Sequence, residues 1–264
     1  MKYSISEMAN YIGSRSGFTP GVAVILGSGL GDFTEQIRSQ IVIPYVEVPN
    51  YPQPTVEGHS GEFVIGNYNN VPIIAAKGRF HYYEGHDIET VTLPIHLFHE
   101  LGVEYIIITN AAGSAKKGLL PGTLMAINGY MDCTFRENLS TPQLISDIPS
   151  KLLGFVEEAG RNTNVKIVQG IYCWTQGPGY ETPAEIEYIQ KLGGAAVGMS
   201  TVPELQAAKQ VGINAIGIST ITNYAAGIID QPLTHAEVIE TANRTKNDFA
   251  DLIGATIENI GEIL

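Results

Sequence analysis

The chain has 264 residues, of which 44% are hydrophobic and 16% charged, and its formal net charge is −12. A charged share below the ~25% of an average soluble protein argues against disorder and favours extra buried surface, as in an oligomer. The acidic balance argues against a generic nucleic-acid binder or a membrane-surface protein, because such proteins are basic.

Cysteine usage and hydropathy indicate the cellular compartment. Cys133 and Cys173 are too few for a disulfide framework. The N-terminal stretch MKYSISEMANYIGSRSGF lacks the apolar core of a signal peptide, and no apolar run reaches the ~18–20 residues of a membrane span. We therefore expect a reduced, soluble, cytoplasmic protein.

Short apolar strands alternate with helical stretches along the chain. Strands are expected at residues 22–26, 63–65, 72–77, 104–109, 123–127, 168–175, 195–199 and 213–219. Helices are expected at residues 6–14, 31–36, 88–100, 149–161, 183–192, 202–211 and 235–260, and a loop at residues 132–150. Several strands are continuously apolar, which is typical of a sheet covered by helices on both faces. The alternation predicts an α/β fold, a three-layer αβα sandwich with a mixed, mostly parallel central sheet, in one domain spanning residues 1–264.

Four helix starts have capping boxes of the form S/T-x-x-E. The boxes begin at Ser4, Thr182, Thr201 and Thr234. They place Glu181 and Ser200 immediately before a helix. Ligands of α/β proteins bind at the carboxyl ends of strands, beside such helix starts.

Two motifs follow the first and third expected strands. In GSGLG (27–31) the glycines let the backbone approach an anion, and Ser28 adds a hydroxyl donor. The stretch is not a complete GxGxxG motif, because Asp32 occupies the position of the last glycine. The alternative is that it forms a plain turn between a strand and a helix. In GRFHYYEGH (78–86), Arg79 and His81 alternate along an extended segment and together suit phosphate or carboxylate. The alternative is a surface Arg79 paired with Glu84 or Asp87. Arg79, the GSGLG amides and the helix starts are the expected local source of positive charge.

Three further motifs lie in the second half of the chain. In QGPGYETPAEI (176–186), Tyr180 offers an aromatic face and Glu181 a carboxylate to a ligand. The alternative is that Glu181 only stabilises the positive end of the helix that follows. AVGMSTVPE (196–204) ends a strand at a helix start, where Met is usually core and Ser usually turn chemistry. STITNYAAG (219–227) places Asn223 after a buried strand, where its amide can present a donor and an acceptor to a ligand. The alternative is that Asn223 forms an Asx-turn at the end of the strand. The HxxH pair at positions 96 and 99 lacks the further ligands that a metal site needs.

In combination, seven stretches resemble the purine nucleoside phosphorylases, specifically their trimeric branch that prefers 6-oxopurines. They occur in the family's order over nearly the whole chain: ILGSGLG, EGHSGEFVIG, KGRFHYYEGH, ITNAAG, QGPGYETPAEI, AVGMSTVPE and ISTITNYAAG. The resemblance implies a pentosyl transfer, the reversible phosphorolysis of inosine and guanosine (deoxy)ribonucleosides to free base and (deoxy)ribose 1-phosphate, in purine salvage. It implies a homotrimer whose partners are a purine nucleoside and phosphate, with no nucleic acid, membrane, metal or organic cofactor; inorganic phosphate is the co-substrate.

The resemblance also implies roles for individual residues. Phosphate would be held by Ser28, His59, Arg79, His81, the backbone at Ala111, and Ser200. The base would be held by Tyr180, Glu181, Val197, Met199 and Asn223. The ribose would contact Tyr83, Met199 and His235, with His235 facing the 5′-hydroxyl. His81, Glu181 and Asn223 would be the catalytic residues.

The chemistry of the reaction agrees with these roles. Breaking an N-glycosidic bond builds positive charge on the sugar, which a phosphate held under C1′ stabilises and attacks. A donor from Asn223 to N7 or O6 would strengthen as the purine leaves. Glu181 would accept the N1–H of hypoxanthine or guanine, which adenine lacks, so the pair predicts inosine and guanosine over adenosine. Tyr180 stands where many relatives have Phe, and its hydroxyl can widen base choice toward xanthosine.

Three alternatives compete with this hypothesis. A methylthioadenosine phosphorylase shares the fold, but its base site lacks the Glu/Asn pair and its 5′ pocket is apolar. A nucleotide-dependent dehydrogenase would need a complete GxGxxG motif. A non-catalytic purine- or phosphate-binding protein would bind without turnover, since fold does not fix function.

Overall fold

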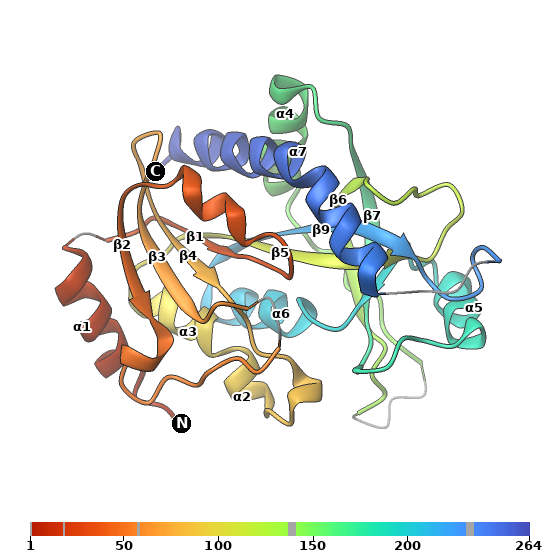
Figure 1. Ribbon diagram of the computed structural model, residues 1–264, viewed down its shortest axis with the longest axis horizontal. Helices are drawn as coiled ribbons and strands as arrows, with labels where there is room; N and C mark the ends of the chain where they lie inside the picture. The colour runs from red at the N-terminus through yellow and green to blue at the C-terminus, as the bar shows by residue number, and fades with distance from the viewer. Residues whose placement is uncertain (1, 18, 57–58, 137–140, 231–234) are drawn as a thin grey trace.

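The computed structural model describes residues 2–17, 19–56, 59–136, 141–230 and 235–264, apart from the side chains of residues 235 and 236. Figure 1 shows a central sheet with helices on both sides. No helix in this described part of the chain is long and apolar enough to cross a membrane.

The described residues form nine strands in one sheet. They are β1 (Val22–Ile25), β2 (Arg38–Pro44), β3 (Glu62–Tyr68), β4 (Val71–Lys77), β5 (Tyr105–Ser114), β6 (Leu124–Asp132), β7 (Ile167–Trp174), β8 (Ala196–Gly198) and β9 (Asn214–Tyr224). Their order is β2-β3-β4-β1-β5-β8-β7-β6-β9, and β5 also pairs with β9. The last five strands in this order therefore close on themselves as a small barrel.

The sheet is mixed, as predicted. β1 is parallel to β4 and β5, and β5 is parallel to β9. The carboxyl ends of these four strands therefore lie at the same edge of the sheet. The pairs β2–β3, β3–β4, β5–β8 and β6–β9 are antiparallel. The predicted α/β class with a mixed central sheet is confirmed, whereas the closure between β5 and β9 was not predicted.

Helices cover both faces of the sheet because its strands are apolar on both sides. The helices are α1 (Ile5–Ser16), α2 (Ile88–Val91), α3 (Leu93–Glu100), α4 (Ser150–Thr163), α5 (Pro183–Lys191), α6 (Val202–Val211) and α7 (His235–Gly261). Ala23 and Ile25 of β1 pack in one core with α1, α3 and α6. Val22 and Val24 pack in a second core with α4 and α7, which Figure 1 shows on the opposite side of the sheet.

Several boundaries differ from the sequence prediction. β2 was missed because it is an edge strand whose first three residues are exposed. Residues 31–36 form a 3-10 helix (Gly31–Gln36). The helix expected at residues 88–100 is divided at Thr92 into α2 and α3, where Pro94 occupies the first turn of α3. In the loop expected at residues 132–150, Ile145 forms a β-bridge with Tyr130.

The capping boxes were predicted with mixed success. Thr182 and Glu185 form the reciprocal box at the start of α5, which confirms that prediction. Ser4 makes no side-chain capping bond to any residue that the structure describes, so the box at α1 was wrong. The box at Thr201 was also wrong, because its glutamate has a different partner, described below. Thr234 lies outside the described residues.

Candidate functional site

A cavity of about 520 Å³ lies where the carboxyl ends of β1, β4 and β9 meet the segments leading into α5 and α6. Residues predicted for the site that line it are Ser28, Arg79, His81, Tyr83, Ala111, Tyr180, Glu181, Val197, Met199, Ser200 and Asn223. His59 is not among the residues that line the cavity, but its Nε2 lies 3.5 Å from the hydroxyl of Ser28, which does line it. The side chain of His235, at the start of α7, lies outside the described residues.

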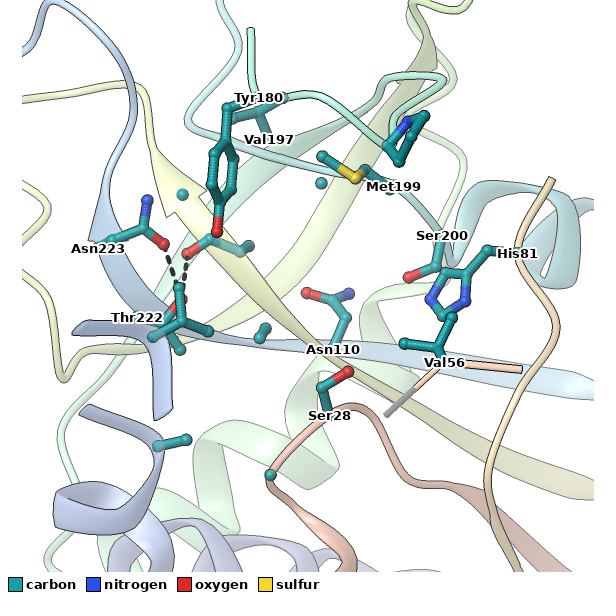
Figure 2. Close-up of a pocket in the computed structure, with 18 of the residues that line it drawn as sticks. Ser28, Val56, His81, Asn110, Tyr180, Val197, Met199, Ser200, Thr222 and Asn223 are labelled. Atoms are coloured by element: carbon teal, nitrogen blue, oxygen red, sulfur yellow. Dashed lines mark hydrogen bonds between the residues drawn. The ribbon is translucent and has the colours of Figure 1, made fainter. Parts of the chain in front are cut away.

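Figure 2 shows the polar groups of the cavity gathered at two ends. Ser28, His81, Asn110 and Ser200 lie at one end, here called the histidine end. Tyr180, Val197, Thr222 and Asn223 lie at the other end. Glu181 follows Tyr180 in the chain and also lines the cavity, so this end is here called the Glu181 end. The sequence motifs therefore meet in one cavity although they are far apart in the chain.

The turn after β1 brings its backbone close to β5. A Cβ atom on Gly27 would lie 2.8 Å from the Cα of Asn110, so only glycine fits there. Gly29 has a φ of 76° and lines the cavity beside Ser28. The element that follows is only a six-residue 3-10 helix, so the expected contribution of an α-helix start to an anion site is missing at this turn.

Arg79 is fully buried and held by a carboxylate. Its Nε and Nη2 donate to the two oxygens of Glu204 at 3.2 and 2.8 Å. Its Nη1 donates to the carbonyl of Thr109 at 2.6 Å and to the hydroxyl of Ser200 at 3.2 Å. Both alternatives for Arg79, a surface pair with Glu84 or with Asp87, are therefore wrong.

This pairing also explains the missing capping box of α6. A buried guanidinium requires a buried anion, and Glu204, the third residue of α6, supplies it. Four of the five N–H groups of Arg79 are used by protein acceptors, which leaves one Nη2–H for a ligand. Arg79 thus offers a positioned donor whose positive charge is already compensated.

His81 is oriented by Glu84. The Glu84 Oε1 accepts from the backbone N–H of His81 at 2.7 Å and lies 3.0 Å from its Nδ1, while Oε2 accepts from the N–H and hydroxyl of Thr55. Burial opposes ionisation of Glu84, but the bonds from His81 and Thr55 outweigh it and lower its pKa to about 2. An ionised carboxylate only accepts, so Nδ1 of His81 carries the proton and Nε2 is left as an acceptor.

Both histidines at this end are neutral at pH 7. Burial lowers the pKa of His81, and the charge of Arg79 adds to this effect although Glu84 opposes it. Burial, His81 and Arg79 lower the pKa of His59 to about 3. The two rings lie 5.4 Å apart. The histidine end is therefore a set of hydrogen-bonding groups with little net charge, in contrast to the positive field that the sequence predicted.

The turn between β8 and α6 is strained. Thr201 is buried with a φ of 75°, which is costly for a β-branched residue and is typical of functional sites. Its hydroxyl accepts from Nδ2 of Asn110 at 2.9 Å. Among the described residues, the buried Oδ1 of Asn110 has no hydrogen-bond partner, and this side chain lines the cavity. Asn110 was missed, although it stands in the ITNAAG stretch at a strand that the sequence analysis predicted.

At the opposite end, the Glu181 carboxylate accepts from the hydroxyl of Thr175 at 2.5 Å. Burial raises the pKa of Glu181, and the Thr175 bond offsets this only in part. The amide of Asn223 is fixed on both sides: Thr222 donates to Oδ1 at 2.9 Å, and Nδ2 donates to the carbonyl of Tyr224 at 2.9 Å. One N–H of Asn223 is left for a ligand. Thr222, another residue that was missed, decides which way this amide faces.

Comparisons with known proteins agree with this arrangement. The model of the phosphorylase superfamily matches residues 21–258. A purine nucleoside phosphorylase 1 of Geobacillus stearothermophilus is 39% identical, over 98% of this chain and 98% of its own. Schistosoma purine nucleoside phosphorylase in complex with hypoxanthine superposes with a TM-score of 0.87 at 28% identity, over 96% of both chains. A Schistosoma mansoni structure in complex with adenosine has the same TM-score, identity and coverage.

Proposed function

The chain belongs to the purine nucleoside phosphorylases of the phosphorylase superfamily, and from this premise we propose that it prefers the 6-oxopurine nucleosides inosine and guanosine. The products are the free base and (deoxy)ribose 1-phosphate. The observation that carries the proposal is that Glu181 and Asn223 line the same cavity as Ser28, His81 and Ser200.

Base preference follows from hydrogen-bonding chemistry. Ionised Glu181 accepts the N1–H of hypoxanthine or guanine. Adenine has no N1 proton, so this partly buried carboxylate would keep only its bond from Thr175 and gain no donor from the base, which is costly. The adenosine complex of the Schistosoma mansoni protein indicates that this fold alone does not decide the base, so the argument depends on Glu181 and Asn223.

The histidine end suits a phosphate ion. The hydroxyls of Ser28 and Ser200, the backbone at Ala111 and the remaining N–H of Arg79 supply donors, and Nε2 of His81 accepts a hydrogen bond from a protonated phosphate oxygen. Held under C1′, a phosphate oxygen forms the new C1′–O bond while the C1′–N9 bond breaks and its electron pair moves into the purine, which then takes one proton from solvent. The free N–H of Asn223 stabilises that charge at N7. Phosphate is the nucleophile, so the proposed reaction uses no metal and no organic cofactor.

We extend the proposal to the setting of the reaction. Purine salvage is the process that consumes such nucleosides, and the cytoplasm is the compartment that the cysteine usage favours. The low charged share of the chain supports an assembly, which we take to be a homotrimer. Its partners are the nucleoside and phosphate, without nucleic acid or membrane.

The test is base release from inosine, guanosine, xanthosine, adenosine and methylthioadenosine, each with and without phosphate. Phosphate-dependent release from inosine and guanosine, with little from adenosine, is expected. Xanthosine turnover would assign a role to the Tyr180 hydroxyl. Turnover of adenosine at a similar rate would contradict the base assignment. Release without phosphate would indicate a hydrolase, and binding without release a non-catalytic protein.

A further inference from the structure

Asn110 connects strand β5 to the turn that leads into α6. Only 1% of its surface is exposed. Its Nδ2 donates to the hydroxyl of Thr201 at 2.9 Å, and that hydroxyl lies 3.2 Å from the Oγ of Ser200. Figure 2 shows the amide nitrogen of Asn110 turned toward Ser200. A short chain of hydrogen-bonding groups therefore runs from β5 to a side chain that lines the cavity.

The direction of these hydrogen bonds follows from counting donors and acceptors. The amide nitrogen of Asn110 only donates, so the oxygen of Thr201 accepts from it. Within the described part of the chain, the Thr201 hydroxyl has one further partner, the Oγ of Ser200. Thr201 is fully buried, and a buried hydroxyl whose proton has no acceptor destabilises the fold. Thr201 therefore donates to Ser200.

Arg79 supplies the second donor to Ser200. Its Nη1 lies 3.2 Å from the same Oγ, and a guanidinium only donates. A hydroxyl oxygen has two lone pairs, and here Thr201 and Arg79 occupy both. The proton of Ser200 is therefore left for the cavity, which this side chain lines.

The orientation of the Asn110 amide decides which atom of Ser200 faces a ligand. In the opposite orientation, the amide oxygen would accept from Thr201. The oxygen of Thr201 would then accept from Ser200, and Ser200 would turn a lone pair toward the cavity. The structure has the first arrangement, because Nδ2 of Asn110 faces Thr201 while Oδ1 has no partner among the residues that the structure describes.

We propose that Asn110 is a positioning residue that holds the Ser200 hydroxyl as a hydrogen-bond donor to phosphate. This inference rests on the proposed function, in which the histidine end of the cavity binds phosphate. Hydrogen bonds to an anion are roughly twice as strong as neutral ones. A lone pair of Ser200 turned toward the anion would remove one such bond and repel the phosphate. Asn110 thus acts on phosphate through Thr201 and Ser200.

A double-mutant cycle tests this route. N110D keeps the shape of the side chain, but at about pH 8 its carboxylate is ionised and only accepts hydrogen bonds. Thr201 then donates to the carboxylate, and Ser200 donates to Thr201. We expect KM for phosphate to rise about tenfold or more, the effect of losing a hydrogen bond to a charged group, while KM for inosine changes much less.

The negative charge of N110D also repels phosphate, and S200A separates this effect from the reversed hydroxyl. In S200A the repulsion remains, but there is no hydroxyl to reverse. N110D should therefore raise KM for phosphate by a smaller factor in S200A than in the parent chain. Equal factors in the two backgrounds overturn the inference. Failure of the parent chain to turn over inosine would instead overturn the proposed function.

Position 201 offers a second test that introduces no charge. T201S keeps the hydroxyl between Asn110 and Ser200, whereas T201V replaces it with a methyl group. KM for phosphate should be several-fold higher in T201V than in T201S, because the Ser200 proton is no longer held toward the cavity. Equal values in the two variants overturn the inference.

N110L and S219A are the controls for packing. N110L leaves Thr201 free to donate to Ser200, so it should raise KM for phosphate less than N110D does. Ser219 pairs with Asn110 across β5 and β9, and its buried hydroxyl has no partner in the described residues. S219A should leave KM for phosphate and for inosine unchanged. Losses as large in either control as in N110D would assign the effect to packing and overturn the inference.

Discussion

Arg79 and Glu204, 125 positions apart in the chain, form a two-point ion pair in which each residue is only 1% exposed. The pair joins the segment after β4 to the first turn of α6, and its Arg79 end borders the cavity. It consequently sets the charge that an incoming phosphate meets.

Replacing Glu204 by Gln should therefore change stability and phosphate response together. Loss of one partner of a buried pair costs about 3–5 kcal/mol, and the neutral, isosteric amide should approach the lower end of this range. Phosphate would then supply the missing negative charge. Thermal unfolding should show that phosphate raises the Tm of E204Q by more than it raises that of the parent chain. E185Q, which affects only the exposed cap of α5, is the control; equal phosphate shifts in E204Q and the parent would contradict this role.

Thr55 should tune His81 through Glu84. T55V removes a hydroxyl that donates to Glu84 at 2.5 Å, and hydrogen bonds to charged groups contribute about 1.5–3 kcal/mol. The His81 ring would lose part of its support, so KM for phosphate should rise several-fold while kcat changes less. T55S keeps the donor and should restore the parent values. A larger loss in kcat than in KM would argue against this route.

The stability of the protein in acid should report on Glu84. Its pKa falls from an ordinary 4.5 to about 2 in the folded chain, so the unfolded chain binds more protons between these values. The contribution of this group is fully present above pH about 4.5 and is lost as pH falls to about 2. T55V should move this loss to higher pH. Urea unfolding at pH 7 and at pH 3 measures the difference, which should be larger for the parent chain than for an E84Q variant.

Glu181 should control inosine turnover and its acid limit. Because burial raises the pKa of this carboxylate, activity on inosine should fall with decreasing pH above the usual range of a glutamate. E181Q should remove this limb and lower kcat/KM for inosine by about 100-fold or more. KM for phosphate should stay nearly constant. Equal losses in both parameters would mean that Glu181 supports the fold of the whole site and not the base.

Thr222 should act through Asn223. T222V removes the hydroxyl that fixes the amide oxygen, which frees the side chain to present oxygen to N7. We expect kcat for inosine to fall about tenfold, the size of a general positioning effect, with a smaller change in KM. T220V is a matched control two residues earlier in β9, because the buried Thr220 hydroxyl has no partner among the described residues. Similar losses in both variants would assign the effect to packing.

Local patterns predicted those parts of the fold that depend on neighbouring residues. Continuously apolar stretches such as VAVI became buried strands, and the Thr182 box became a real helix cap. β2 escaped because an edge strand needs no apolar pattern on its open side. The motifs also brought most of the cavity residues to attention, since glycines, Arg79, His81, Glu181 and Asn223 lie at strand ends where α/β folds bind ligands.

By itself, then, the amino-acid sequence determined the strand and helix order, the family resemblance and most side chains of the cavity. Only the tertiary structure decided which partner each of these groups takes. Glu204 stands at the position that a capping box requires, but its carboxylate pairs with the buried guanidinium of Arg79 instead. An unpaired buried charge costs more free energy than a missing helix cap. Asn110 and Thr222 follow the same rule: their roles depend on closure of the sheet and on long-range packing, which no local spacing encodes.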